Sequence, residues 1–198
     1  MRTRTSFIAV SIASVLFASL GCETCDQCKS SSEHPGASSS ARLTPRPASA
    51  TFDDAVMSRL ASLEGAWEMA DEAGQGNTAS IFHVSSNGSV VREVMFPGQP
   101  HEMTNLYHMD GKDAVVTHYC AVGNQPRMVA TRVDQTDEGP SIDYEFQRVS
   151  NFRDGQGHVM GSLRLVFVDD DTLQEHWRSM DAAGNAEEEM VFVLKRKR

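Results

Sequence analysis

Short runs of β-favouring residues, each bounded by Gly, Asp, Asn or Pro, recur along the chain from residue 65 onward. Gly, Asn and Asp adopt the backbone conformations that tight hairpins need, so this spacing predicts ten strands joined by short turns. The predicted strands cover residues 65–70, 78–85, 89–96, 102–109, 113–122, 126–134, 140–149, 158–168, 172–179 and 187–196. The turn signals between them include Asn87-Gly88, Asp110-Gly111, Glu138-Gly139, Asp154-Gly155 and Gly184-Asn185.

The short connections make successive strands antiparallel neighbours. No second helical layer is predicted that could cover the outer strands, and closing the sheet on itself removes its unpaired edges. We therefore predict an all-β fold, a single antiparallel up-and-down β-barrel of about ten strands. An open two-sheet sandwich is the competing architecture.

One short amphipathic helix is predicted before the first strand, over residues 52–63. Its apolar residues recur every three or four positions, and acidic residues occupy the first turn, where the helix dipole favours negative charge. The apolar positions are Phe52, Val56, Leu60 and Leu63. Gly65 is expected to end this segment.

The N-terminus has the pattern of a secretory signal: Arg2 and Arg4 precede an apolar run over residues 7–20. The run is shorter than the ~20 apolar residues that a membrane span needs. Its end, Ser19-Leu20-Gly21-Cys22, resembles the bacterial lipoprotein box, although Ser19 stands where that family usually has leucine. The resemblance implies lipidation of Cys22. Plain secretion, with cleavage near Gly21, is the alternative.

These features divide the chain into three parts. Residues 1–21 are the predicted signal peptide, residues 22–50 a flexible tether and residues 51–198 the barrel domain. The tether is rich in Ser, Ala and Pro, and it has too few apolar side chains to offset the entropy of ordering. We expect a lipid-anchored protein of a bacterial cell envelope, on the periplasmic or outer-membrane side.

The net charge of the chain and the distribution of its basic residues indicate which classes of partner to expect. The formal net charge is −9, and the basic residues form no stripe apart from the last four, Lys195–Arg198. An acidic protein is repelled by phosphate backbones, so nucleic acid is not an expected partner. The expected partners are a membrane, through the anchor, and a small-molecule ligand.

The cysteines give only a weak metal signal. Cys22, Cys25 and Cys28 form a C-x-x-C-x-x-C run, but the first is the lipidation candidate and no fourth ligand lies nearby. Outside the cytoplasm, Cys25 and Cys28 pair as a local disulfide or stay as exposed thiols, and the sequence leaves this open. Cys120 is either a small buried apolar residue or part of a site. No metal site is predicted.

A family resemblance supports the barrel. The segment Leu63-Glu64-Gly65-Ala66-Trp67 resembles the Gly-x-Trp opening of calycin barrels, namely lipocalins, fatty-acid-binding proteins and nitrobindin-like proteins. The resemblance implies that Gly65 lets the chain enter the first strand and that Trp67 plugs one barrel end. It also implies that Lys195, Arg196 or Lys197 covers the indole. Residues 107–128 resemble uncharacterised lipocalin-like domains of bacteria. The resemblance implies that the barrel binds a small, mostly apolar ligand.

The densest group of polar residues lies between His118 and Arg127. Side chains alternate along a strand, so His118 and Cys120 share one face, and Asn124 and Arg127 follow at the next turn. We predict that these four residues line the barrel mouth and fix the polar end of a ligand. The alternative is a specially shaped turn that amides hold together, with His118 hydrogen-bonded inside it or at its rim.

Two further residues complete the predicted ligand-binding set. His108 lies about five residues before the turn at Gly111, and His118 lies about as far beyond it, so the two imidazoles are predicted to face each other. Trp177 shares a strand face with Glu175 and either packs on the barrel wall or lines a cavity.

Other functions compete with ligand binding. The nitrobindin-like resemblance raises haem, with His158 or His176 as ligand, although no cofactor is part of the leading prediction. A metal ion bound by barrel histidines belongs to the same alternative. Catalysis by Cys120 with His118 is disfavoured, because same-face neighbours lie ~7 Å apart and no oxyanion loop accompanies them. A structural or interaction lipoprotein with a filled barrel is the remaining alternative.

Overall fold

The computed structural model describes residues 50–70, 76–153 and 155–198, and it describes side chains from residue 55 onward. The predictions of a signal peptide, of lipidation at Cys22 and of the Cys25–Cys28 pairing fall outside the described part. The predicted tether, residues 22–50, lies outside it except for residue 50. No helix within the described residues has both the length and the hydropathy to cross a membrane.

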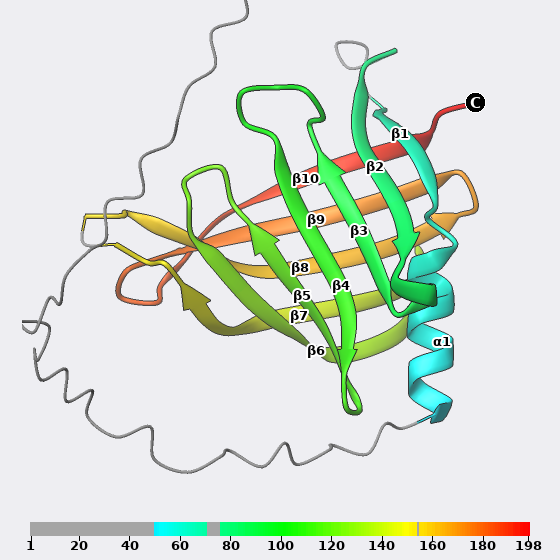
Figure 1. Cartoon of the computed structure of the whole chain (residues 1–198), viewed down its shortest axis with the longest axis horizontal. Coiled ribbons are helices and arrows are strands. Elements are labelled where there is room, and N and C mark those ends of the chain that lie inside the picture. Colours follow the sequence, from blue (N-terminus) through cyan, green and yellow to red (C-terminus); the bar gives the residue numbers. More distant parts are fainter. Residues whose placement is uncertain (1–49, 71–75, 154) are drawn as a thin grey trace, which may run out of the picture. The chain divides into compact units, whose positions relative to one another are not determined.

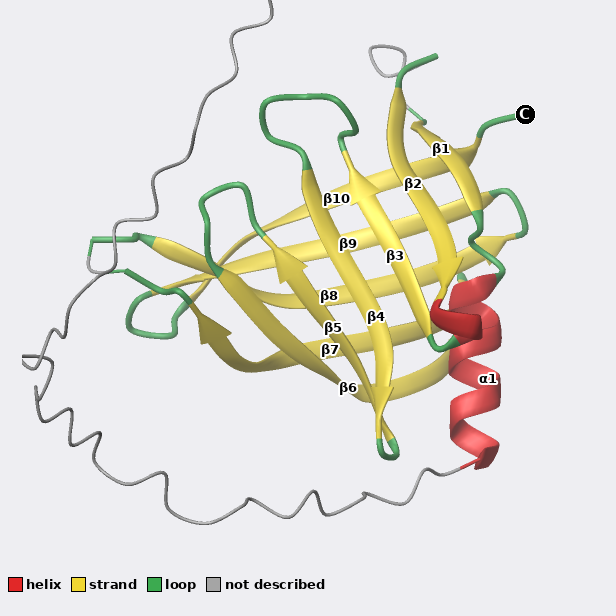
Figure 2. Cartoon of the chain, in the orientation of Figure 1, coloured by secondary structure: helices red, strands yellow, loops and turns green. Residues whose placement is uncertain are grey.

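Ten antiparallel strands form one closed barrel, in which each strand pairs with its neighbours in sequence and β1 pairs with β10 (Figures 1 and 2). This confirms the predicted barrel and excludes the open sandwich. The strands are β1 (Gly65–Met69), β2 (Thr78–Ser85), β3 (Val90–Met95), β4 (Met103–Asp110), β5 (Asp113–Tyr119), β6 (Gln125–Thr136), β7 (Gly139–Ser150), β8 (His158–Asp169), β9 (Thr172–Asp181) and β10 (Ala186–Arg196). A short 3-10 turn, η1 (Ser86–Gly88), joins β2 to β3.

The predicted turns have the expected geometry where the structure describes them. Asp110 pairs directly with Asp113, which leaves a two-residue turn that begins with Gly111 at φ +65°. Gly favours this conformation because it has no Cβ, and such turns match the twist of a hairpin. The sequence therefore places the β4–β5 turn correctly.

Helix α1 (Ala50–Ala61) lies at one end of the barrel (Figure 1). It ends before residue 63, where the sequence analysis placed its end. Val56, Leu60 and Leu63 are at most 2% exposed and pack into the barrel core. The apolar spacing of the sequence therefore identifies the face that closes this end.

The Gly-x-Trp segment occupies the position that the calycin resemblance implies. Trp67 is 1% exposed, and its indole Nε1 donates to the Leu63 carbonyl oxygen at 2.8 Å. The guanidinium of Arg196 lies 4.3 Å from the centre of the indole ring and donates to the Ser62 and Glu64 carbonyl oxygens. Of the three basic residues predicted for this role, Arg196 is the one that covers the indole. The architecture is compatible with a calycin-like fold.

Large side chains fill much of the barrel interior. Those that are fully buried are Trp67, Trp177, Tyr107, Tyr144, Phe82, Leu60, Met128, Ile142, Leu163, Leu165, Leu173 and Leu194. They come from α1 and from strands on all sides of the barrel, so the lumen is largely a packed core. Polar side chains are also buried within this core, and they form the candidate site.

Candidate functional site

A row of polar side chains crosses the barrel wall on its inner face, over strands β3, β4 and β5. Glu93 pairs directly with Asn105, and Asn105 pairs directly with His118. Side chains opposite each other on antiparallel strands lie close together, so the three form a continuous row. Glu93 and Asn105 are 0% exposed, and His118 is 1% exposed.

Glu93 accepts three hydrogen bonds inside the barrel. Ser80 Oγ donates to Oε1 at 2.7 Å, while Asn105 Nδ2 and Tyr107 OH donate to Oε2 at 2.7 and 2.8 Å. All three partners donate, and this arrangement suits an ionised carboxylate. Glu93 is therefore a buried negative charge held by neutral donors.

His118 extends this network as a neutral imidazole. Its Nδ1 lies 2.7 Å from Asn105 Oδ1. The Asn105 amide nitrogen already donates to Glu93, so Oδ1 is the acceptor and Nδ1 carries the proton. Burial lowers the pKa of His118 to about 4. Nε2 consequently keeps a buried lone pair, and it has no hydrogen-bond partner among the described residues.

Glu175 of β9 brings a second carboxyl group to the same region. Trp177 Nε1 donates to Glu175 Oε2 at 3.1 Å, and the Trp177 ring lies 5.0 Å from that of His118. Burial, and then the nearby Glu93 carboxylate, raises the pKa of Glu175 well above its ordinary value. Burial therefore favours the protonated form of this carboxyl group. Its Oε1 accepts no hydrogen bond from any residue that the structure describes.

Two tyrosines lie beside the carboxyl groups. The rings of Tyr107 and Tyr144 are 6.2 Å apart, and both side chains are 0% exposed. Burial raises the pKa of Tyr107, and the Glu93 and Glu175 carboxyl groups raise it further. Both carboxyl groups are thus close to one phenol. The hydroxyl of Tyr144 has no partner within the described part of the chain.

A small gap adjoins Glu175 inside the barrel. It leaves no room for a water molecule. Its lining consists of Met69, Ala79, Ser80, Met95, Phe96, Glu175, Phe192 and Leu194. Apart from Ser80 and Glu175 the lining is apolar, so the gap combines an apolar surface with a carboxyl group whose Oε1 has no partner among the described residues.

Phe96 covers this gap at the end of β3. Its ring lies 5.8 Å from that of Phe192 and 5.0 Å from that of His101. Phe96 has a φ of +52°, in the left-handed region that bulky side chains rarely occupy. Strained backbone of this kind persists only where the surroundings hold it, and it is common at ligand clamps.

The structure brings only some of the predicted site residues together. His118 and Trp177 face the lumen and contact each other. Asn124 is fully buried, and its amide nitrogen lies 3.5 Å from the His158 carbonyl oxygen. Cys120 is half-buried, and its backbone amide donates to the Asn124 carbonyl oxygen. Asn124 and Cys120 thus shape the β5–β6 turn.

Two other predicted residues do not join this group. Arg127 alternates with buried Met128 on β6 and turns outward, where it contacts Asp110 at 2.6 Å and also Gln147. His108 pairs with Val115, whereas His118 pairs with Asn105, so the predicted facing of the two histidines is wrong. The error comes from the register, which places the two histidines three pairs apart on opposite faces of the sheet.

Sequence reasoning missed Glu93, Asn105 and Tyr107 as site residues. A signal was present, because alternation along β3 places Glu93 on the same face as the buried residues Val91 and Met95. A charged residue on an apolar strand face is an informative exception.

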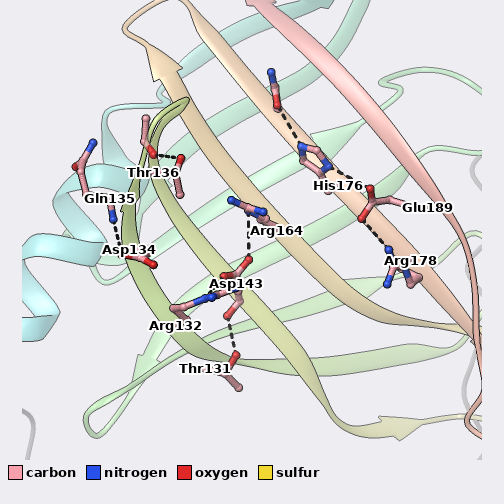
Figure 3. A network of polar contacts seen from close by, with 12 residues as sticks. Thr131, Arg132, Asp134, Gln135, Thr136, Asp143, Arg164, His176, Arg178 and Glu189 are labelled. Atoms are coloured by element: carbon pink, nitrogen blue, oxygen red, sulfur yellow. Dashed lines mark hydrogen bonds and ion pairs between the residues drawn. The ribbon is translucent and has the colours of Figure 1, made fainter.

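On the outer wall of the barrel, carboxylates pair with basic side chains (Figure 3). Asp143 lies between Arg132 at 2.7 Å and Arg164 at 3.4 Å. Glu189 lies between His176 at 3.4 Å and Arg178 at 3.2 Å. These outer carboxylates have cationic neighbours, whereas the two carboxyl groups of the lumen are held by neutral donors.

The histidines considered for haem lie away from the lumen. His158 is exposed, and His176 contacts Gln174 and Glu189 on the outer wall. Within the described ranges, no three His, Cys, Asp or Glu side chains are grouped as metal ligands would be. The imidazole whose lone pair faces the interior is that of His118.

Comparison with known proteins finds no family model and no curated protein that matches this chain. The likeness to calycin barrels therefore depends on the Gly65–Trp67 segment, on Arg196 and on the barrel itself.

Proposed function

We propose that this protein is a calycin-type barrel of the bacterial cell envelope, which binds a small, mostly apolar ligand in its lumen. The observation that carries the proposal is the apolar gap beside Glu175, whose Oε1 accepts no hydrogen bond from the described residues. Ligand pockets are typically apolar with a few convergent polar groups, and this lining has that composition.

Energetics favour a ligand that supplies hydrogen bonds. A buried polar atom without a partner costs about 1–3 kcal/mol. The polar core contains several such atoms, including Glu175 Oε1, His118 Nε2 and the Tyr144 hydroxyl. A ligand that forms a hydrogen bond with any of these atoms offsets part of this cost. A core packed with apolar side chains alone would not carry the cost at all.

Entry to the gap requires Phe96 to move. Phe96 is half-buried, follows the last residue of β3 and has the strained φ described above. Rotation of its ring away from Phe192 would enlarge the gap toward solvent. Relief of the backbone strain at Phe96 would offset part of the energy lost when the Phe96 and Phe192 rings separate.

Native mass spectrometry of the full chain, purified from its host, tests the binding role. We expect a co-purified small molecule that is lost in Ala79→Leu, because Ala79 lines the gap and a larger side chain would fill it. Met57→Leu is the matched control, since Met57 packs against the core on α1 rather than in the gap. Absence of a bound molecule, together with failure of benzyl alcohol to bind, would contradict the proposal.

We also propose that a lipid on Cys22 anchors the barrel to a membrane. The lipoprotein-like segment before Cys22 supports this, and several acyl chains, each adding ~0.8 kcal/mol per buried CH₂, would hold the protein firmly. Metabolic labelling with an alkyne-bearing fatty acid should label the wild type and not Cys22→Ser. Equal labelling of both proteins, or of neither, would contradict the anchor.

The extensive core packing favours a second candidate, an interaction protein with a filled barrel. At the loops beyond β7 and β9, a groove of about 290 Å³ is lined largely by apolar residues, including Phe152, which is 41% exposed. An exposed apolar surface of this kind suits protein contact. A photo-crosslinker placed at Phe152 in growing cells should then yield one dominant adduct. Its absence, with a ligand found in the lumen, would reject this candidate.

A further inference from the structure

We propose that a second cavity, between α1 and the β8–β9 turn, binds a small zwitterion that carries one carboxylate, one ammonium group and an apolar side chain. This cavity shares no lining residue with the gap beside Glu175, so the inference is independent of the proposed function. It follows from three features of the cavity: its size, its unpaired charges and its apolar surface.

The cavity is large enough for a small molecule. α1 and the β8–β9 turn lie at the same end of the barrel, and the cavity between them has a volume of about 520 Å³ (Figure 1). Small-molecule sites commonly have volumes in this range. Residues from α1, β1, β7, β8 and β10 contribute to the lining, so the secondary structure of the barrel end holds the cavity in shape.

Arg59 of α1 provides the positive charge of the cavity. Its guanidinium carbon lies 5.5 Å from the centre of the Phe167 ring, within the range of a cation–π contact. The guanidinium makes no hydrogen bond or ion pair with any residue that the structure describes. Its N–H donors form a planar fork that matches a carboxylate, so Arg59 can bind the acidic group of a ligand.

Arg196, the other guanidinium in the lining, is already engaged. It donates to three backbone carbonyl oxygens, those of Ser62, Glu64 and Asp170. Arg59 is therefore the cation that a ligand can pair with in this cavity.

Three aspartates in the β8–β9 turn provide the negative charge, and two of them have partners within the protein. Asp169 accepts a hydrogen bond from the Asp171 backbone amide at 2.8 Å, and a hydrogen bond with the Thr172 side chain lowers its pKa. Asp171 pairs with Arg198 at 2.7 Å. The carboxylate of Asp170 has no such partner among the described residues, so it can bind the basic group of a ligand.

These charges favour a zwitterion over a simple ion. Arg59 belongs to α1 and Asp170 to the β8–β9 turn, so a molecule between the two elements meets one charge of each sign. The three aspartates would repel an anion that has no positive group. Within the described ranges, no group of acidic side chains is arranged to hold a metal ion. An amino acid has both of the charges that remain unpaired in the cavity.

Apolar side chains form another part of the cavity surface. Pro140, Phe167 and Val168 line it beside the charged residues, and Val168 is 37% exposed. An apolar side chain on the ligand would remove this surface from water, which is favourable. The cavity therefore suits an apolar amino acid better than a polar one.

Three compounds with the same phenyl ring test the proposal: phenylalanine, 3-phenylpropanoate, which lacks the ammonium group, and phenethylamine, which lacks the carboxylate. Isothermal titration calorimetry on the full chain would give their dissociation constants for wild type, Arg59→Gln and Asp170→Asn. Arg92→Gln and Glu188→Gln are the matched controls, because each removes the same charge from an exposed strand position outside the cavity lining.

We expect wild type and both controls to bind phenylalanine at least tenfold more tightly than either singly charged compound. Arg59→Gln should bind phenylalanine no more tightly than phenethylamine, because the partner of the carboxylate is gone. Asp170→Asn should bind phenylalanine no more tightly than 3-phenylpropanoate, because the partner of the ammonium group is gone.

The wild-type preference in Arg59→Gln or Asp170→Asn would overturn the inference, and so would an equal loss of affinity in the controls. Failure of all three compounds to bind wild type would also overturn it, while the lumen ligand that Ala79→Leu tests would be unaffected. Circular dichroism checks that each variant is folded. Should Arg59→Gln not fold, Arg59→Lys carries the test, since without the forked donors it must bind phenylalanine less tightly than wild type does.

Discussion

His118 makes the stability of the barrel depend on pH. The pKa of this imidazole falls from 6.5 in the unfolded chain to about 4 in the folded protein, because burial disfavours its charged form. Between pH 4 and pH 6.5 the imidazole of His118 is protonated in the unfolded chain but not in the folded protein, which favours unfolding. The stability that neutral His118 provides is therefore fully present above pH 6.5. It is lost as the pH falls through the folded pKa. A shift of this size corresponds to about 3 kcal/mol.

Comparison of wild type with His118→Gln isolates this effect. The free energy of unfolding of the wild type should decline relative to that of the variant by about 3 kcal/mol between pH ~7 and pH ~4. Urea denaturation at several pH values measures both. The raised pKa of Glu175 acts in the opposite direction, since its contribution is fully present below its unfolded pKa and is lost as the pH rises. Glu175 is present in both proteins, so its effect cancels. A difference that stays constant with pH would contradict the prediction.

At the same scale, the sequence identifies site residues unevenly. His118 stands out in the sequence because it begins the densest group of polar residues, and Trp177 stands out because the chain has only two tryptophans. Glu93 and Glu175 resemble the many surface acids of an acidic chain, and only the alternation of each strand marks them as inward-facing. Asn105 becomes a site residue only because the strand register places it between Glu93 and His118.

Among the structural elements, the β6–β7 hairpin depends on one glycine. Gly139 begins β7 with a φ of +131°, and a Cβ there would collide with the backbone carbonyl oxygen of Phe167 on β8. We expect Gly139→Ala to lower the free energy of unfolding by about 3 kcal/mol, because it adds a steric clash to the cost of an unfavourable φ.

Gly184→Ala is the matched control for this prediction. Gly184 has a φ of +87°, but a Cβ there meets nothing within 4 Å. Its substitution should lower the free energy of unfolding by only about 1 kcal/mol, the cost of an unfavourable φ. Thermal or urea unfolding of the two variants separates the terms. Equal losses of stability would show that the close approach to β8 does not matter.

The strands and turns were largely predictable, because their signals are local. Glycines at positive φ in the Asp110–Gly111 and Glu138–Gly139 turns are marked in the sequence. The register of pairing was not predictable with the same accuracy. It depends on irregularities such as the shift between Arg127 and Met128, which no local residue pattern announces.

Across the whole molecule, Arg196 joins segments that are distant in the chain. Its guanidinium stacks on Trp67, donates to the Ser62 and Glu64 carbonyl oxygens and reaches Asp171 at 3.4 Å. Arg196→Ala should lower the free energy of unfolding by about 2–3 kcal/mol, because it removes a cation–π contact and two hydrogen bonds. Arg196→Lys should restore less than half of this, since a lysine cannot reproduce the forked geometry.

Urea denaturation of both variants beside Arg198→Ala checks the prediction. Arg198 also pairs with Asp171, but its side chain is 87% exposed, so its removal should leave the unfolding curve unchanged. Equal curves for Arg196→Ala and wild type would mean that closure of this end does not depend on the stacked guanidinium.

At this scale the sequence predicted the barrel but not its lumen. Alternation and turn chemistry indicate how many strands there are, and closure follows from the absence of any cover for the edges. The approach of Glu175 on β9 to Glu93 on β3 depends instead on the closure of the sheet, which lets side chains of distant strands meet inside it, and on which side chains fill the barrel. These are tertiary properties that depend on all ten strands at once.

The seam between β1 and β10 has a consequence for biosynthesis. Glu64 and Arg196, which meet at this seam, are 132 positions apart. While the chain is being made, β1 has no partner on one side until nearly everything after it has been synthesised. During that interval its open edge is available to any other extended peptide, so a holding chaperone that shields this edge should raise the yield of folded protein.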